Sequence, residues 1–154
     1  MEQLPIVIRP STNSGEDFAF IYNTWVQSFR NQIDNKWQDY QHYKAKQSLI
    51  IQSILKRTNS TKVLLASYAD DPDTYLGWIC YEQLTKFKVV HYMYVKKIYK
   101  RNGIAKMLLT RAGFKIDKPI PCSHATYILD KVADKYQVLY LPELKKGAYL
   151  YEKL

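Results

Sequence analysis

Apolar side chains recur with a helical period in two segments near the start of the chain. The first stripe has spacings of three and four residues and runs to about Asn31; it comprises Phe18, Ile21, Tyr22, Trp25, Val26 and Phe29. The second, over about 41–57, places Tyr43, Gln47, Ile50, Ile51 and Ile54 on one face. Such stripes are typical of amphipathic helices. We therefore expect two helices here, preceded by a short strand at 5–9.

The period then changes to that of strands. Runs rich in β-branched and aromatic residues at 62–68, 75–82 and 88–95 each predict a strand. The segment Asp70–Asp73 contains Pro72 and three aspartates, which favour a turn, so the first two strands should form a hairpin.

Shorter elements complete the predicted fold. Ile104, Met107, Leu108 and Ala112 predict a helix that Gly103 opens and Gly113 ends. The strand–helix–strand unit around 89–123 implies a parallel strand pair. We expect one α/β domain over 1–154, with a mixed, mostly antiparallel sheet, a parallel central pair and about four flanking helices. The remaining predicted elements are strands at 119–123, 138–141 and 148–151 and a helix at 126–136.

Composition narrows the class of protein. A chain of 154 residues with 47% apolar and 24% charged residues fits one globular domain and excludes a disordered chain. No apolar run approaches the roughly 20 residues of a membrane helix, so we expect no membrane partner. Residues 1–12 lack the pattern of a signal peptide, and the two cysteines are too few for a disulfide scaffold. We therefore expect a cytoplasmic protein.

The formal net charge of +9 is unevenly placed. The segment Lys86–Lys118 holds ten basic side chains and one acidic one, whereas the other 13 basic and 13 acidic groups cancel. Such a surface attracts a phosphorylated cofactor, a nucleic acid or an anionic membrane. The alternative is a solvated, lysine-rich face.

The segment Tyr94–Leu109 reads as a strand, a basic loop and a helix, with Gly103 at the junction. The first turn of a helix presents unpaired N–H groups and partial positive charge. Gly103 and the small Ala105 allow phosphates to approach the backbone. The spacing is neither that of a Walker loop nor that of a dinucleotide fingerprint. The pattern therefore indicates a pyrophosphate site. The positively charged side chains of this site would be Lys100, Arg101 and Lys106.

This segment resembles the cofactor loop of the GNAT family of N-acetyltransferases, which reads Arg/Gln-x-x-Gly-x-Gly/Ala after a strand ending in an aliphatic residue and Val. Here Lys100-Arg-Asn-Gly-Ile-Ala105 follows Tyr94-Val95, and Lys100 departs from the usual Arg or Gln. The element order is also similar along almost the whole chain. The resemblance implies an acyl-CoA-dependent N-acyltransferase that uses acetyl-CoA or another acyl-CoA, needs no metal and acts on an unidentified amine. Small GNAT-like proteins of phages look similar too.

The resemblance also implies which residues bind the cofactor. Backbone groups of Met93, Tyr94 and Val95 would line the pantetheine arm, at a bulge between two splaying strands. N–H groups from Arg101 to Lys106 would hold the pyrophosphate. The expected cofactor-binding residues are thus Met93, Tyr94, Val95, Lys100, Arg101, Asn102, Gly103, Ile104, Ala105 and Lys106.

Acyl transfer to an amine needs a base, and histidine suits this role near neutral pH. The two-residue period of a strand places His91 on one face with Met93 and Val95; a packed core histidine is the alternative. His124 follows the neighbouring strand and would face the cleft or merely begin a helix. Tyr136 is the nearest match to the tyrosine that protonates the leaving thiolate in many GNAT enzymes. The usual Tyr-x-x-x-Gly-Phe ending is absent, and a core role also fits Tyr136.

Trp25 and Arg30 lie where the resemblance implies the wall of the acceptor site. Trp25 also fits a core position, and Arg30 would suit an acidic acceptor group. The competing interpretation is a non-catalytic binding protein on the same fold, for nucleic acid or a protein partner, because lysines and tyrosines together can contact phosphates and bases. A nucleic-acid-bound, polyanionic acceptor would combine the two interpretations. We expect a monomer or a homodimer.

Overall fold

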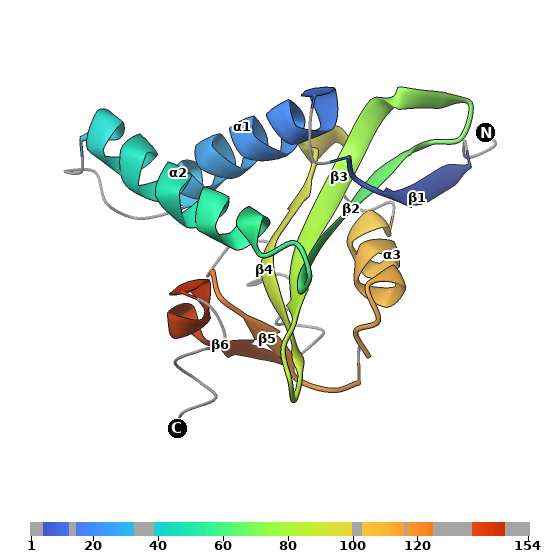
Figure 1. Cartoon of the computed structure of the whole chain (residues 1–154). Coiled ribbons are helices and arrows are strands. Elements are labelled where there is room, and N and C mark those ends of the chain that lie inside the picture. Colours follow the sequence, from blue (N-terminus) through green and yellow to red (C-terminus); the bar gives the residue numbers. More distant parts are fainter. Residues whose placement is uncertain are drawn as a thin grey trace.

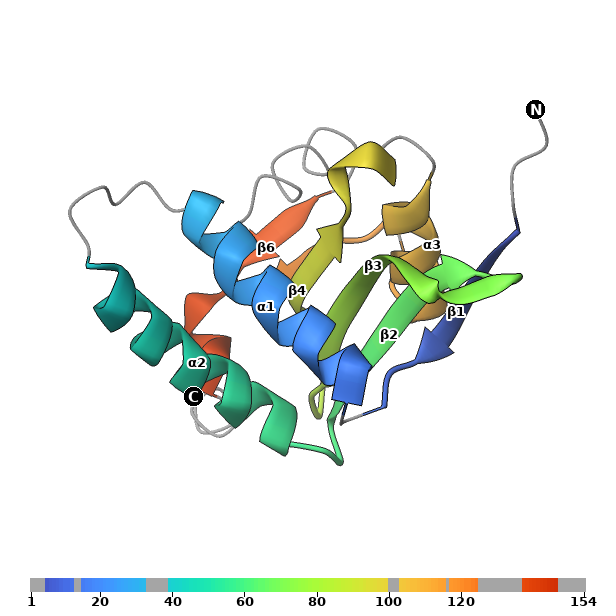
Figure 2. The same cartoon turned by 90° about the horizontal axis from the view of Figure 1, so that it is seen from above.

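The computed structural model describes residues 5–12, 15–32, 39–99, 103–115, 117–124 and 137–146. In these segments a six-stranded sheet lies between helices α1 and α2 on one side and helix α3 on the other (Figure 1; Figure 2). The predicted helix at 126–136 and the predicted strand at 148–151 lie outside the described residues. The elements are β1 (Ile6–Pro10), α1 (Gly15–Gln32), α2 (Tyr40–Lys56), β2 (Thr61–Tyr68), β3 (Asp71–Gln83), β4 (Lys88–Val95), η1 (Lys97–Tyr99), α3 (Ile104–Arg111), β5 (Ile120–Cys122), β6 (Val138–Tyr140) and η2 (Pro142–Lys146).

The strands lie in the sheet in the order in which they occur in the chain, β1 to β6. The pairings from β1 to β4 are antiparallel, whereas β4–β5 and β5–β6 are parallel. A parallel pair needs a crossover, and α3 supplies it between β4 and β5. The mixed α/β sheet predicted from the sequence is therefore confirmed.

Both faces of the sheet are buried, which explains why the strands read as nearly continuous apolar runs. On one face the fully buried Trp25 of α1 and Ile51 of α2 pack against Leu65 and Trp78. On the other face α3 buries Leu108 and its neighbours. Among the described helices, none is long and apolar enough to cross a membrane.

A β-bulge interrupts the pairing of β3 with β4. Cys80 lies opposite Tyr92 but Tyr81 lies opposite Val90, so His91 is an extra residue in β4. The bulge places His91 and Tyr92 on the same side of the sheet, toward α1 and α2, whereas Met93 and Val95 face α3. The expectation that His91 shares a face with Met93 and Val95 is therefore wrong, because a bulge breaks the two-residue period.

The hairpin between β2 and β3 is tighter than predicted. The pairing of Tyr68 with Asp71 leaves only two residues in the turn, so β3 already begins at Asp71. The predicted turn at Asp70–Asp73 is thus wrong in its bounds. Pro72 is tolerated because it lies exposed near the first residue of a strand, where a missing N–H donor costs little.

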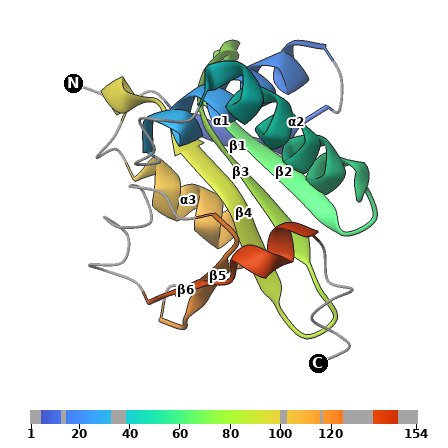
Figure 3. The ribbon, with the colours of Figure 1, turned by 90° about the vertical axis from the view of Figure 1, so that its left-hand side faces the viewer.

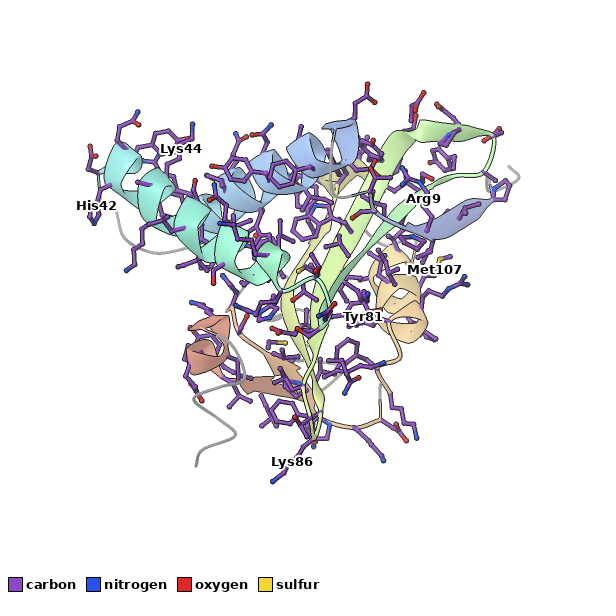
Figure 4. The ribbon with its side chains drawn as sticks, in the orientation of Figure 1. Arg9, His42, Lys44, Tyr81, Lys86 and Met107 are labelled. Atoms are coloured by element: carbon purple, nitrogen blue, oxygen red, sulfur yellow. The ribbon has the colours of Figure 1, made fainter. Side chains whose placement is uncertain are left out.

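Helix α3 begins after Gly103, as expected, but exposes a different face. Met107 is 36% exposed and lies on the outer side of the helix, whereas Leu109 is buried in its place (Figure 4). The helix ends before Gly113, whose φ of 91° favours glycine. At this end Lys88 donates a hydrogen bond of 2.8 Å to the carbonyl of Ala112. One cation of the basic segment thus stabilises the negative end of α3.

Candidate active site

Strands β4 and β5 pair at one point only and then part (Figure 3). That point is Val90 opposite Cys122, where the N–H of Ser123 donates to the carbonyl of Val90 at 3.0 Å. Beyond it β5 ends, whereas β4 continues to Val95. In the described part of the chain, this far half of β4 pairs with β3 on one edge and with no strand on its other edge. The edge of β4 beyond Val90 is therefore open on the side of β5 among the described residues; we call this opening the V and Val90 its vertex.

The edge of β4 that faces this V carries available backbone groups. Lys96 donates its N–H to the carbonyl of Leu76 at 2.9 Å, which fixes the alternation of the β3–β4 ladder. The N–H and C=O groups of Tyr94 then point toward β3, and those of Met93 and Val95 point into the V. Of the three predicted pantetheine contacts, Met93 and Val95 thus have backbone groups that point away from β3 and have no partner among the described residues.

The N-terminus of α3 follows β4 after η1. Its N-cap is Gly103, which has a φ of 75°, and a Cβ added there would meet nothing within 4 Å. The first hydrogen bond of the helix runs from the N–H of Met107 to the carbonyl of Gly103 at 3.0 Å. The N–H groups of residues 104–106 consequently have no partner within the helix. The side chain of Ile104 is buried in the core, so this residue offers only its backbone, and Lys106 is exposed.

A buried hydrogen bond closes the vertex of the V. His91 and Ser123 are the residues that follow the last β4–β5 pair, and both are fully buried. The Nδ1 of His91 lies 2.7 Å from the hydroxyl of Ser123, and its Nε2 lies 2.7 Å from a carboxylate oxygen of Glu82. An acid, a histidine and a hydroxyl are thus aligned where the strands separate.

Further polar groups extend this alignment to α2. The Nδ1 of His124 lies 3.0 Å from the hydroxyl of Ser123, and its Nε2 lies 3.3 Å from the amide nitrogen of Gln47. We call Glu82, His91, Ser123, His124 and Gln47 the vertex chain.

The vertex chain has one consistent set of donors and acceptors. An ionised Glu82 only accepts, so His91 donates from Nε2 and its Nδ1 accepts from the hydroxyl of Ser123. Ser123 in turn accepts from the Nδ1–H of His124, and the amide of Gln47 donates to the Nε2 of His124. The four hydrogen bonds therefore run in one direction: each group donates to the next, from Gln47 on α2 to Glu82.

The carboxylate of Glu82 is anchored at the end of α2. Arg57 donates to both of its oxygens at 3.0 Å, and the hydroxyl of Ser60 donates at 2.7 Å. Burial alone would raise the pKa of Glu82, but hydrogen bonds from His91, Arg57 and Ser60 lower the pKa to about 2. Glu82 is therefore an anion at neutral pH and the buried end of an ion pair with the partly exposed Arg57.

The two histidines of the vertex chain are neutral at this pH. Burial lowers the pKa of His91, against the opposing effect of the Glu82 carboxylate. Burial holds the pKa of His124 well below its usual range, and the nearby ammonium of Lys145 lowers it further. The ring of His124 is surrounded edge-to-face by Trp25, Phe29 and Tyr92 at 5.0–5.9 Å between centroids.

Acid should destabilise the fold in a window set by these groups. The folded pKa values of His91, His124 and Glu82 lie below the unfolded values of about 6.5 and 4.3. At a pH between a group's folded and unfolded pKa, the unfolded chain binds more protons than the folded one. The free energy of unfolding is therefore highest above about pH 6.5 and falls as the pH drops toward 2. Thermal unfolding followed by circular dichroism should give a lower midpoint at pH 5 than at pH 7. His124→Gln should flatten this dependence and His42→Gln, at an exposed site, should not; equal midpoints for the wild type at both pH values would contradict the account.

The structure brings together some of the predicted site residues and separates others. His91 and His124 meet through Ser123, and Trp25 contacts His124 as a fully buried core residue. Arg30 is exposed and lies apart, with its guanidinium 4.0 Å from the ring centroid of Tyr40. Predicted residues outside the described part of the chain are Lys100, Arg101, Asn102 and Tyr136.

Sequence reasoning missed three members of the vertex chain: Glu82, Ser123 and Gln47. Glu82 continues the face of Trp78 and Cys80, and an acid at the end of an apolar run is a signal that it is buried with a partner. Ser123 directly precedes His124, which offers a polar pair at the end of a strand. Gln47 was recognised only as a member of an apolar stripe.

No group of three or more His, Cys, Asp or Glu side chains that could hold a metal ion occurs among the described residues. Both cysteines there are free and buried, and burial raises the pKa of Cys122 to about 12.

The described residues thus form a mixed sheet that opens between two parallel strands, and a helix N-terminus that begins after a glycine follows the first of these strands. No protein-family model and no curated protein sequence matches the chain. Among solved structures, a protein from Pyrococcus furiosus, provisionally assigned as an acetyl transferase, is similar over 97% of this chain and 90% of its own. The identity is 14% and the TM-score 0.58. This likeness confirms the predicted GNAT-like fold.

Two further solved structures are similar at lower scores. A predicted acetyltransferase with acetyl-CoA from Clostridium acetobutylicum aligns over 97% of this chain and 90% of its own, at 10% identity and a TM-score of 0.48. A protein from Desulfovibrio desulfuricans, provisionally assigned to the GNAT acetyltransferases, aligns over 97% and 83%, at 12% identity and a TM-score of 0.46.

Proposed function

We propose that this protein is an acyl-CoA-dependent N-acyltransferase. The observation that carries the proposal is the opening between β4 and β5, into which Met93 and Val95 direct backbone groups that no described residue bonds. The acyl-pantetheine arm would lie along this edge of β4 and complete the ladder that β5 leaves unfilled. The acyl end would then lie near the vertex, next to Ser123 and His124.

The N-terminus of α3 would hold the pyrophosphate. The unpaired N–H groups of residues 104–106 and the helix dipole favour an anion there. The left-handed φ of Gly103 and the space around its α-carbon let a phosphate approach without a side chain in the way. Lys96, Lys97 and Lys106 belong to the segment that carries the excess charge, and none of them forms one of the ion pairs seen among the described residues. Acyl-CoA would supply the activated thioester.

The vertex chain suggests how the amine would lose its proton. His91 is fully buried and its Nε2–H is engaged by Glu82, so the imidazole accepts only at Nδ1. The amine N–H bond would break as its proton passes to the oxygen of Ser123, while the hydroxyl proton of Ser123 passes to His91. The imidazolium formed would be stabilised by Glu82. His91 thus serves as the base through Ser123. The amine nitrogen would then attack the thioester carbonyl, the C–S bond would break as the amide forms, and the departing CoA thiolate would take up the second proton that the nitrogen loses.

The test combines turnover with variants at Ser123. With acetyl-CoA and a panel of primary amines, the wild-type protein should release free CoA thiol in the presence of at least one amine. Ser123→Ala should lower that rate by about 10² to 10⁴, the usual share of acid–base catalysis, with little change in acetyl-CoA affinity. Ser123→Thr keeps the hydroxyl and should recover activity. An unchanged rate and pH profile in Ser123→Ala would remove the vertex chain from the mechanism.

A further inference from the structure

Gln47 is a buried polar side chain on the apolar face of α2. It shares that face with Tyr43, Ile51 and Ile54, and only 4% of its surface is exposed. An apolar side chain could be buried here without the cost of desolvating an amide. The amide nitrogen of Gln47 lies 3.3 Å from the Nε2 of His124, at the α2 end of the vertex chain. The use of an amide at this position thus points to a role in that chain.

The amide of Gln47 fixes which nitrogen of His124 carries the proton. His124 is neutral, because burial holds its pKa well below its usual range, so its ring has a single N–H. Glu82 only accepts, which makes the Nδ1 of His91 an acceptor and the hydroxyl of Ser123 its donor. The contact of 3.0 Å between Ser123 and the Nδ1 of His124 then needs a donor on His124. The Nε2 of His124 is left as an acceptor, and the amide N–H of Gln47 is the donor that it meets.

The ring of His124 is held in place by its aromatic neighbours. The rings of Trp25, Phe29 and Tyr92 stand at 70° to 87° to it, and only 1% of His124 is exposed. The tautomer of a histidine is set by the hydrogen bond that its other nitrogen makes. For this buried ring, the bond from Gln47 to Nε2 therefore favours a proton on Nδ1.

The tautomer of His124 decides where the hydroxyl proton of Ser123 goes. The hydroxyl oxygen has one proton to give and two lone pairs. When Nδ1 of His124 carries the proton, one lone pair accepts it, and the hydroxyl proton goes to the Nδ1 of His91 at 2.7 Å. The second lone pair stays available for the proton of an amine. When Nε2 of His124 carries the proton, both imidazoles accept at Nδ1 and compete for the single hydroxyl proton.

We propose that Gln47 is a positioning residue that directs the hydroxyl proton of Ser123 to His91 by selecting the Nδ1-protonated tautomer of His124. The inference rests on the proposed acyl transfer and adds a residue to its proton path. Gln47 is three hydrogen bonds away from His91, and it acts on the reaction only through His124 and Ser123.

The tautomer is measured by ¹H–¹⁵N correlation NMR of the histidine side chains in the full chain at pH 7, where the signal of His124 is the one that His124→Gln removes. Wild-type His124 should carry its proton on Nδ1. Gln47→Met keeps the unbranched shape of the side chain but removes the donor, so the Nε2-protonated tautomer should become populated. Gln52→Met, at an exposed position of the same helix, is the matched control and should keep the wild-type tautomer.

Turnover supplies the second readout. Gln47→Met should lower kcat by about 10- to 100-fold, a part of the roughly 10²- to 10⁴-fold share of acid–base catalysis. The KM for acetyl-CoA should stay unchanged, and Gln52→Met should match the wild type in both constants.

The outcomes separate this inference from the proposed function. A proton on Nε2 in wild-type His124 overturns the inference without any turnover and even if Gln47→Met does not fold. An unchanged tautomer in Gln47→Met, or an unchanged kcat in this variant, overturns the inference while the proposed acyl transfer stands. A wild-type protein that acylates no amine overturns the proposed function, and the positioning role of Gln47 falls with it whatever the tautomer.

Discussion

Gly103→Glu should weaken acetyl-CoA binding by about 100-fold or more. A carboxylate at the N-cap of α3 would face the pyrophosphate, and like charges brought together cost several kcal/mol, of which each 1.4 kcal/mol is a tenfold loss. The Cβ would project into the space that the ligand needs, since nothing lies within 4 Å of it in the protein. Affinity would be measured by fluorescence or calorimetric titration of both proteins.

The chain offers a matched control for this change. Gly15, at the start of α1, has a φ of 69°, is exposed and has nothing within 4 Å of an added Cβ. Gly15→Glu therefore imposes the same backbone strain and the same charge at a helix N-terminus, away from the V. It should keep wild-type affinity. An equal loss of acetyl-CoA affinity in both variants would show that Gly103→Glu acts through folding. Wild-type affinity in both variants would show that the cofactor does not bind at the N-terminus of α3.

Glu82→Ala should lower the free energy of unfolding by about 3–5 kcal/mol, the usual cost of removing one partner of a buried ion pair. The change leaves the guanidinium of Arg57 and the Nε2–H of His91 facing an empty space, and Ser60 loses the shorter of its two hydrogen bonds. Urea unfolding at pH 7 measures the loss.

Two comparisons make the Glu82 prediction specific. Glu143→Ala, at an exposed position of η2, should change the free energy of unfolding by less than about 0.5 kcal/mol. Glu82→Gln keeps an acceptor oxygen but removes the charge, so its loss in free energy of unfolding should lie between those of Glu82→Ala and Glu143→Ala. A Glu82→Ala protein as stable as the wild type would mean that Glu82 does not pair with Arg57 and His91 in solution.

Most of the fold was predictable because the period of the apolar positions is set by local geometry. The 88–95 strand, the helix after Gly103 and the parallel strand near 120 all follow from such patterns, and the structure confirms them. The bulge was not predictable, since it depends on how β4 registers with β3, a contact that no local pattern encodes. That single residue reversed the side of the sheet on which His91 lies.

The candidate site was predictable only where a motif carries the chemistry. Gly103 and the two histidines were identified, but the sequence separates Glu82, His91 and Ser123 by many residues, and only the fold aligns them. The similarity to phage proteins and the roles of Tyr136 and Arg101 stay predictions.

Calorimetric titration of the wild-type protein with acetyl-CoA tests the central claim most directly. The account predicts saturable, one-site binding with a dissociation constant in the usual range for substrates, about 1 μM to 1 mM. Binding should weaken with added salt because phosphate contacts to lysines contribute to it. Absence of binding at millimolar acetyl-CoA would contradict the account and leave a protein that has the fold without the cofactor.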